Sequence, residues 1–168
     1  MKLKKEIKGK CIVMGDDVST DDIIPGRYIR AVTPDKLGEF AFRDSREIKG
    51  YDIIVAGKNF GMGSSREQAP IALILAGIKF VVAKSFARIF YRNCIAVGLL
   101  PLIGNINPLT GDILIFNPYE KKIRTPKGLW DVKIPDGLPM EILDAGGMIG
   151  YLKNNIKGIT ENTEQKLQ

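Results

Sequence analysis

The sequence contains no histidine and only two cysteines, Cys11 and Cys94. Because histidine is the commonest general base in enzymes, any acid–base chemistry here must use serine, lysine, tyrosine or a carboxylate. Two cysteines without histidine cannot by themselves hold a usual zinc ion or iron–sulfur cluster. Both cysteines stand in apolar surroundings, which indicates buried free thiols. We therefore expect no metal site built from this chain alone.

The sequence also lacks any apolar run that approaches the roughly 20 residues of a membrane-spanning helix. The stretch Met1–Lys8 is charged and has no apolar core, so it is not typical of a signal peptide. These two absences predict a cytoplasmic protein without a membrane segment. Of the 168 residues, 45% are hydrophobic and 26% are charged, which is ordinary for one globular domain with a sizeable core.

The formal net charge is +6 at pH 7. The sequence has no basic stripe with interleaved aromatic residues, so the charge does not by itself predict a nucleic-acid partner. Small anionic substrates or an acidic partner explain it equally well.

Apolar strands at 52–56 and 80–83 flank a nearly all-apolar helix at 71–76. Strand, helix and strand in this order predict a parallel βαβ unit. The sequence also predicts a strand at 7–14, an edge strand at 99–103 that contains Pro101, and short antiparallel strands at 112–116, 122–125 and 130–134. Further helices are expected at 33–42, at 84–97 between Ser85 and Gly98, and at 140–145, with a further turn at 151–155. Residues 1–155 are thus predicted to form one α/β domain, followed by a polar, frayed tail at 156–168.

The strand at 52–56 leads into a glycine-rich segment, Gly57–Pro70. Ser64 and Ser65 each precede a glutamate or glutamine by three positions, as in a capping box, which predicts that they stand at a helix N-terminus. Such an end offers free N–H groups and a partial positive charge to an anion, and Arg66 adds a bidentate partner for a carboxylate or phosphate. A glycine turn followed by an ordinary helix cap would explain the same residues.

A second polar loop, Gly15–Asp22, carries four aspartates. Its spacing lacks the glycine and the distal glutamate of a calcium-binding EF-hand loop, so the alternative is that the aspartates fix turns by bonding the backbone. In the following stretch, 23–30, Pro25 and Gly26 are expected to prevent any regular element. The arginines of that stretch either face solvent or contact an anion.

Three stretches, read together, match a known family: Gly15–Pro25, Gly57–Ala69 and Ala83–Asn93, with Glu141–Gly147 fitting as well. The chain resembles the small subunits of 3-isopropylmalate dehydratase (isopropylmalate isomerase) and homoaconitase, which are similar to the swivelling domain of aconitase. The resemblance extends to about residue 155. It implies an α/β fold of the swivelling β/β/α type, with a parallel βαβ core and additional short strands.

The resemblance also implies a function. The chain would be the small subunit of a two-subunit hydro-lyase in leucine biosynthesis, which moves a hydroxyl group between adjacent carbons of a small hydroxy acid by dehydration and rehydration. The family's 4Fe–4S cluster is held by the separate large subunit, so this chain would carry no cofactor. A hetero-oligomer is expected, without nucleic acid or membrane.

The same resemblance assigns roles to residues. Ser64 matches the catalytic base, which acts as an alkoxide, and Ser65 and Arg66 match binders of substrate carboxylates. Thr20 and Asp21 match a pair that borders the site and helps to orient its groups. Met62 stands where relatives often have a cysteine that is not a cluster ligand, so this departure matters little.

A second departure concerns specificity. In the family, the loop after the Pro-Gly turn contacts the variable group of the substrate, and isopropylmalate enzymes tend to have an apolar residue where homoaconitase-type subunits have arginine. Here Arg30 stands at that position, which suits a third carboxylate and leaves a homoaconitase or dual-specificity enzyme as an alternative. A stand-alone anion- or RNA-binding module is the alternative from another class, supported by the net charge and by the expected anion site.

Overall fold

The computed structural model describes residues 5–156 of the chain. Within this range, seven strands form one sheet in the order β4-β3-β2-β1-β5-β6-β7. The strands are β1 (Ile7–Val13), β2 (Ile53–Ala56), β3 (Phe80–Ala83), β4 (Leu100–Ile103), β5 (Ile113–Asn117), β6 (Lys122–Thr125) and β7 (Gly128–Asp131). The helices are α1 (Thr20–Ile23), α2 (Gly26–Ala31), the 3₁₀ helix η1 (Pro34–Phe40), α3 (Gln68–Leu75), α4 (Arg88–Val97) and α5 (Leu138–Asp144), and residues 148–156 are also helical.

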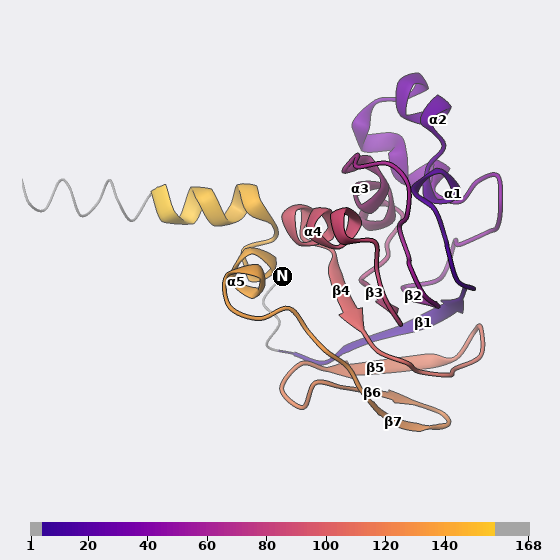
Figure 1. The fold of residues 1–168 in the computed structure, drawn as a ribbon, viewed down its shortest axis with the longest axis vertical. Helices are drawn as coiled ribbons and strands as arrows, with labels where there is room; N and C mark the ends of the chain where they lie inside the picture. The colour runs from indigo at the N-terminus through magenta and orange to yellow at the C-terminus, as the bar shows by residue number, and fades with distance from the viewer. Residues whose placement is uncertain (1–4, 157–168) are drawn as a thin grey trace, which may run out of the picture.

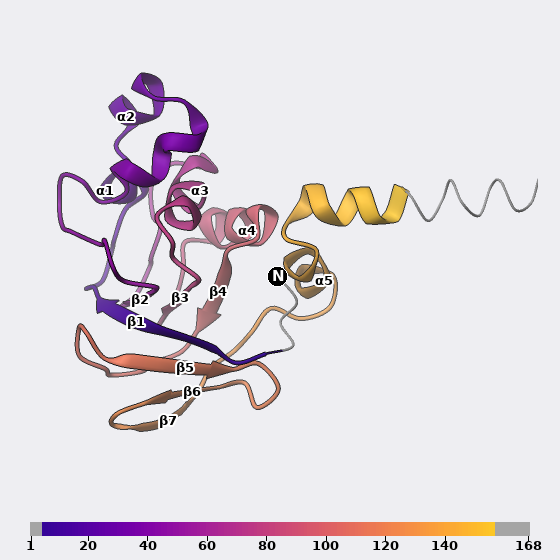
Figure 2. The same cartoon turned by 180° about the vertical axis from the view of Figure 1, so that it is seen from behind.

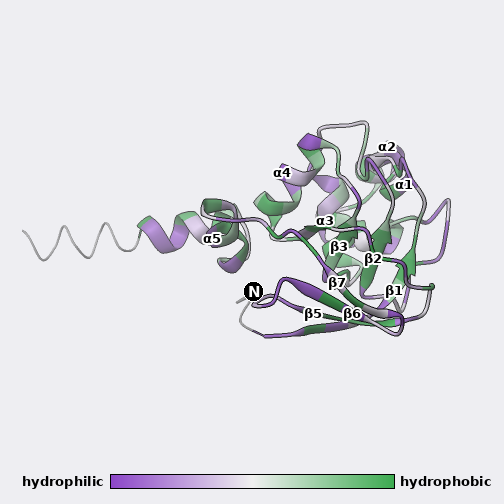
Figure 3. Cartoon of the chain, turned by 60° about the horizontal axis from the view of Figure 1, so that its bottom comes forward, coloured by the Kyte–Doolittle hydropathy of each residue, from purple (hydrophilic) through white to green (hydrophobic). Residues whose placement is uncertain are grey.

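The sheet has a parallel half and an antiparallel half that share β1. Strands β1 to β4 pair in parallel, and β2 and β3 are joined through α3, which confirms the predicted βαβ unit. Strands β1, β5, β6 and β7 pair antiparallel. All four residues of β2 and of β3 are buried, as expected for strands that are covered on both faces. Figure 3 accordingly shows both strands as hydrophobic.

The parallel strands separate two apolar cores. Figures 1 and 2 show, from opposite sides, α1 and α3 on one side of these strands and β5 to β7 on the other. On one face, Ile54 and Val81 pack with residues of α1, α3 and η1. On the other face, Ile53 and Val82 pack with Leu114 and Phe116 of β5 and with residues of α5. This gives helices, parallel strands and antiparallel strands in three layers, so the predicted β/β/α class is confirmed.

The two ends of the sheet meet. Lys133, which follows β7, exchanges two backbone hydrogen bonds with Ile103 of β4, at 2.9 and 2.7 Å. Strand β4 lies at the edge of the sheet, which confirms the prediction made from Pro101. The bridge between Ile103 and Lys133 covers part of that edge.

Most predicted strands agree with the structure to within a residue, but three expectations about other elements were wrong. The stretch after Pro25 is helical as α2, because Pro25 stands at the N-cap with φ −56° and ψ 138° and so precedes the helix without interrupting it. Helix α4 begins at Arg88 and not at Ser85, because the Ser85 hydroxyl accepts the Asn59 N–H at 2.9 Å and is not available as a cap. The last predicted strand lies two to three residues earlier, as β7.

At the C-terminal end, the expected extra turn is a longer helix, residues 148–156, that extends away from the body (Figure 1). Ile156, the first residue of the predicted tail, is still helical, and residues 157–168 lie outside the described residues. The division into a domain at 1–155 and a tail at 156–168 therefore stays a prediction. Among the helices of the described range, none combines the length and the apolar character that crossing a bilayer requires.

Because β5 contributes to the second core, we expect the antiparallel half of the sheet to be needed for stability. Phe116 of β5 is completely buried, with its ring centroid 5.7 Å from that of Phe80. Phe116→Ala should lower the free energy of unfolding by about 3–5 kcal/mol, the usual cost of removing a buried aromatic ring. The control is Leu129→Ala on β7, because the Leu129 side chain is 52% exposed. This substitution should change the free energy of unfolding by less than about 0.5 kcal/mol. Urea unfolding followed by circular dichroism measures both, and equal losses would contradict the assignment of Phe116 to a core.

Candidate functional site

The two polar loops found in the sequence follow neighbouring parallel strands. The loop after β1 contains Ser19 and Thr20, and the loop after β2 contains Met62 and Ser64. Because the carboxyl ends of parallel strands meet at one edge of a sheet, the loops lie side by side there. The N–H of Thr20 donates to the Met62 carbonyl at 2.8 Å, and the N–H of Gly61 donates to the Val18 carbonyl at 2.7 Å.

Three of the four aspartates in the first loop, Gly15–Asp22, form hydrogen bonds that fix the two loops. This agrees with the interpretation that these aspartates stabilise turns. Asp16 accepts the Lys58 N–H at 2.7 Å, and Asp17 accepts the Asn59 side-chain amide at 2.9 Å. Asp22 and Ser19 form a reciprocal capping box at the start of α1. Within residues 5–156, no cluster of three or more carboxylate or cysteine side chains is arranged to hold a metal ion.

The glycine loop needs at least one of its glycines for close packing. Gly61 has φ +82°, and a Cβ placed there would lie 2.1 Å from Cγ of Phe90 in α4. Phe60 packs edge-on against the same ring, with the centroids 5.4 Å apart. The loop is therefore pressed onto α4 on one side and joined to α1 on the other.

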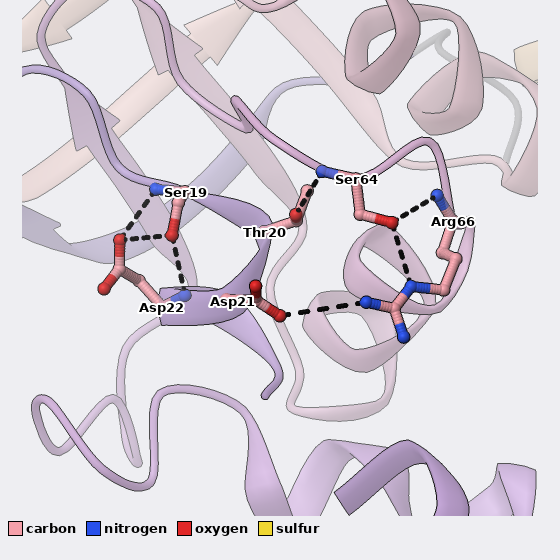
Figure 4. A network of polar contacts seen from close by, with 6 residues as sticks. All are labelled: Ser19, Thr20, Asp21, Asp22, Ser64 and Arg66. Atoms are coloured by element: carbon pink, nitrogen blue, oxygen red, sulfur yellow. Dashed lines mark hydrogen bonds and ion pairs between the residues drawn. The ribbon is translucent and has the colours of Figure 1, made fainter. Parts of the chain in front are cut away.

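Ser64 lies at the centre of the polar contacts drawn in Figure 4. Its backbone N–H donates to Oγ1 of the buried Thr20 at 3.0 Å, which fixes its backbone against α1. Its Oγ accepts from Nε of Arg66 at 2.9 Å and from the Arg66 backbone N–H at 3.3 Å. The guanidinium charge thus stands directly beside the serine oxygen, and this arrangement favours the deprotonated form of the hydroxyl.

Arg66 connects the serine to further charged groups. Its Nη2 lies 3.8 Å from Oδ1 of Asp21, a long contact between exposed side chains. Its Nη1 lies 3.3 Å from the point where Gly26 would carry a Cβ, and Nη1 of Arg30 lies 3.7 Å from the same point. Two guanidinium groups therefore approach Gly26, and such a pair of like charges suits an anionic ligand.

The predicted helix caps at Ser64 and Ser65 were wrong. Helix α3 begins at Gln68, its N-cap is Glu67, and no side chain caps it. The Ser64 hydroxyl contacts Arg66 instead, and the Ser65 side chain is exposed. The α3 N-terminus follows the serines by several residues, so the positive charge next to Ser64 comes from Arg66.

Asn93 of α4 is a site residue that sequence reasoning did not single out. Its side-chain amide donates to the Ser65 carbonyl at 2.8 Å and so holds the serine loop to α4, whereas Thr20 holds it to α1. The only sequence signal was its position in the third matching stretch. The structure thus brings together Thr20, Asp21, Ser64, Arg66 and Arg30, whereas Ser65 contributes its backbone to the network.

The crevice between these residues is narrow. It is lined by Thr20, Asp21, Ile24, Ile29, Ser64, Arg66 and Ala69, and it has no room for a water molecule. A ligand would therefore have to lie on the outside of this surface, with other groups enclosing it.

The two cysteines do not form part of this site. Cys11 and Cys94 are free and completely buried, and they belong to different cores on opposite faces of the sheet. Burial raises the pKa of the Cys11 thiol to about 11 and that of Cys94 well above its usual value. Buried neutral thiols that are apart from each other do not fit the ligand set of an iron–sulfur cluster.

Comparisons with known proteins agree with this architecture. The family model described as the aconitase C-terminal domain matches residues 17–105. The chain is 48% identical over 155 residues to the methanogen homoaconitase small subunit of Methanocaldococcus jannaschii, covering 88% of this chain and 91% of the relative. It is 42% identical over 167 residues to the 3-isopropylmalate dehydratase small subunit of Halothermothrix orenii, covering 90% and 98%.

A solved structure gives the same result for the fold. The crystal structure of a 3-isopropylmalate dehydratase from M. jannaschii superposes with a TM-score of 0.87 at 44% identity, over 94% of this chain and 99% of that chain. The matching model covers both loops of the site, and the relatives are matched over nearly their whole length. The chain therefore belongs to the aconitase C-terminal domain family, among the small subunits of the isopropylmalate dehydratase and homoaconitase type.

Proposed function

We propose that this chain is the small subunit of a cytoplasmic two-subunit hydro-lyase that interconverts 2-isopropylmalate and 3-isopropylmalate in leucine biosynthesis. The observation that carries the proposal is the contact of Ser64 Oγ with the guanidinium of Arg66 at 2.9 Å. The name of the Halothermothrix orenii relative supports this reaction, whereas that of the Methanocaldococcus jannaschii relative supports the related homoaconitase reaction. The words "small subunit" in both names imply a larger partner. The 4Fe–4S cluster is assigned to that large subunit, since the residues of this chain do not fit it.

Ser64 is the proposed catalytic base. A serine hydroxyl is a weak base because its alkoxide is costly to form. A hydrogen bond from a charged donor is worth about 1.5–3 kcal/mol, and it strengthens when the oxygen becomes negative. Two N–H groups of Arg66 donate to Ser64 Oγ, at 2.9 and 3.3 Å. In the dehydration, the Ser64 alkoxide takes the proton from the substrate carbon, and the electrons of that C–H bond form the double bond as the neighbouring hydroxyl leaves as hydroxide. The cluster of the large subunit would supply the Lewis acid that accepts this hydroxide.

The other residues have binding roles in this proposal. The outer nitrogens of Arg66 and the exposed Ser65 hydroxyl bind a substrate carboxylate. Thr20 holds the Ser64 backbone, and Asp21 orients Arg66 through the contact between their side chains. Since the crevice is too narrow for a substrate, the large subunit must supply the opposite wall, and closing it would remove water and strengthen each charged contact.

One observation keeps homoaconitase activity as a second candidate. The Arg30 and Arg66 guanidinium groups approach the same point above Gly26, where a third carboxylate would find two positive partners. The stand-alone binding module is not favoured, because binding alone does not require a serine oxygen held against a guanidinium.

The proposal predicts that activity requires two subunits. The purified chain alone should bind no iron and show no dehydratase turnover, because its residues do not fit a cluster. Addition of the large subunit from the same organism should produce turnover, measured as absorbance of the unsaturated intermediate. Turnover by the isolated chain would contradict the two-subunit proposal.

Replacement of the proposed base gives a second prediction. In the assembled enzyme, Ser64→Ala should lower kcat by at least about 10²-fold, the low end for a positioned general base, with assembly unchanged. Ser65→Ala, one residue away and exposed, is the matched control and should have a milder effect. Near-normal kcat in Ser64→Ala would leave the serine with only a structural role.

Arg30 should control the choice of substrate. A carboxylate gains a charged hydrogen bond to its guanidinium, whereas an isopropyl group leaves the guanidinium partly desolvated and unpaired. Arg30→Val should therefore move kcat/KM towards isopropylmalate and away from homocitrate-type substrates, by about tenfold for each 1.4 kcal/mol of differential binding. The assay compares both substrates with the same large subunit, and an unchanged ratio would show that Arg30 faces solvent.

A further inference from the structure

Helix α2, which carries Arg30, is only partly anchored by apolar packing. None of its six residues is buried, and it lies at the outer end of the helical layer (Figure 1). Tyr28 and Ile29 are partly buried and pack against the first core, and the centroid of the Tyr28 ring lies 4.9 Å from that of Phe40. A short helix of this kind is not stable by itself, so other contacts must set its position.

Those contacts converge on one carboxylate. Oδ1 of Asp44 accepts the Tyr28 hydroxyl at 2.7 Å, and Oδ2 accepts from Nη2 of Arg27 in an ion pair. Tyr28 and Arg27 are neighbours in α2. The two oxygens of Asp44 therefore hold two successive side chains of the helix, which fixes its rotation as well as its distance from the body.

Asp44 is itself held by the core. It lies in the turn after η1, two residues beyond Phe42, whose side chain is 1% exposed. The Phe42 N–H donates to the Ile23 carbonyl at the end of α1 at 2.8 Å, and the Phe42 carbonyl accepts the N–H groups of Ser45 and Arg46. The carboxylate thus projects from a turn that is anchored to α1, the helix that also carries Thr20.

We propose that Asp44 is a positioning residue for substrate specificity, which fixes α2 so that the Arg30 guanidinium stays beside that of Arg66 above Gly26. This inference rests on the proposed function, because it concerns the group that contacts the variable arm of the substrate. Asp44 contacts α2 and no group of the crevice described above, so it acts through Arg30. Two like-charged guanidinium groups repel each other, and an external anchor offsets that repulsion when no anion is present.

The first test measures the helix directly and needs no turnover. Hydrogen–deuterium exchange of the full chain should show amides of 26–32 exchanging about threefold to tenfold faster in Asp44→Ala, since local opening becomes easier when the anchor is lost. Asp44→Asn keeps an oxygen for the Tyr28 hydroxyl, so its amides in 26–32 should exchange at a rate between those of wild type and Asp44→Ala. Glu39→Ala removes an exposed carboxylate from the neighbouring η1 and is the matched control, with exchange like wild type. Unchanged exchange in Asp44→Ala would overturn the proposal.

The second test asks whether Asp44 acts through Arg30. In the assembled enzyme, Asp44→Ala should shift the ratio of kcat/KM values for isopropylmalate and a homocitrate-type substrate in the same direction as Arg30→Val. In the Arg30→Val background it should produce no further shift, because residues that act as a unit are not additive. An equal shift in both backgrounds would overturn the inference, as would an unchanged ratio in the wild-type background. If neither substrate were turned over by the wild-type enzyme, the proposed function would fail, while the exchange experiment would still decide whether Asp44 anchors α2.

Discussion

The site depends on one hydrogen bond between two loops that are 44 residues apart, from the Ser64 N–H to Oγ1 of Thr20. Thr20 is 4% exposed, so its hydroxyl has little access to water. A buried polar group that loses its partner costs about 1–3 kcal/mol, which resists separation of the loops. Because this bond fixes the serine backbone, the side chain is presented to Arg66 before any substrate arrives. Such preorganisation is the main way in which a protein stabilises developing charge.

The parallel half of the sheet determines the position of the hydrogen bond between Ser64 and Thr20. Strands β1 and β2 pair directly, so the loops that follow them must leave the sheet side by side. The close approach of Gly61 to Phe90 then presses the second loop onto α4, and Asn93 of the same helix holds the Ser65 carbonyl. The serine loop is thus fixed from α1 and from α4, although it has no regular secondary structure.

The sequence predicted much of the fold because its strands are short apolar runs between glycines and polar turns. It failed where a side chain has a distant partner. Ser64, Ser65 and Ser85 resemble helix caps locally, but the Ser64 and Ser85 hydroxyls have other partners, at Arg66 and Asn59. Pro25 was interpreted as a break, whereas it precedes a helix.

For the site, sequence reasoning named the residues but not their arrangement. The resemblance supplied Thr20, Asp21, Ser64 and Arg66, and the structure places them within one network. Asn93 contacts Ser65, which is 28 residues away in the sequence, and Asp44 contacts Tyr28, which is 16 residues away. No local sequence pattern indicates such contacts.

The antiparallel half of the sheet has a consequence for work with this protein. Strands β6 and β7 lie at the end of the molecule opposite α1 and α2, and the turn between them, at Pro126 and Lys127, is exposed (Figures 1 and 2). Exposed hairpin tips of this kind tolerate added sequence better than packed segments do. A peptide tag or fluorescent reporter could therefore be inserted at this turn, far from the serine loop, to follow association with a partner without modifying either chain terminus.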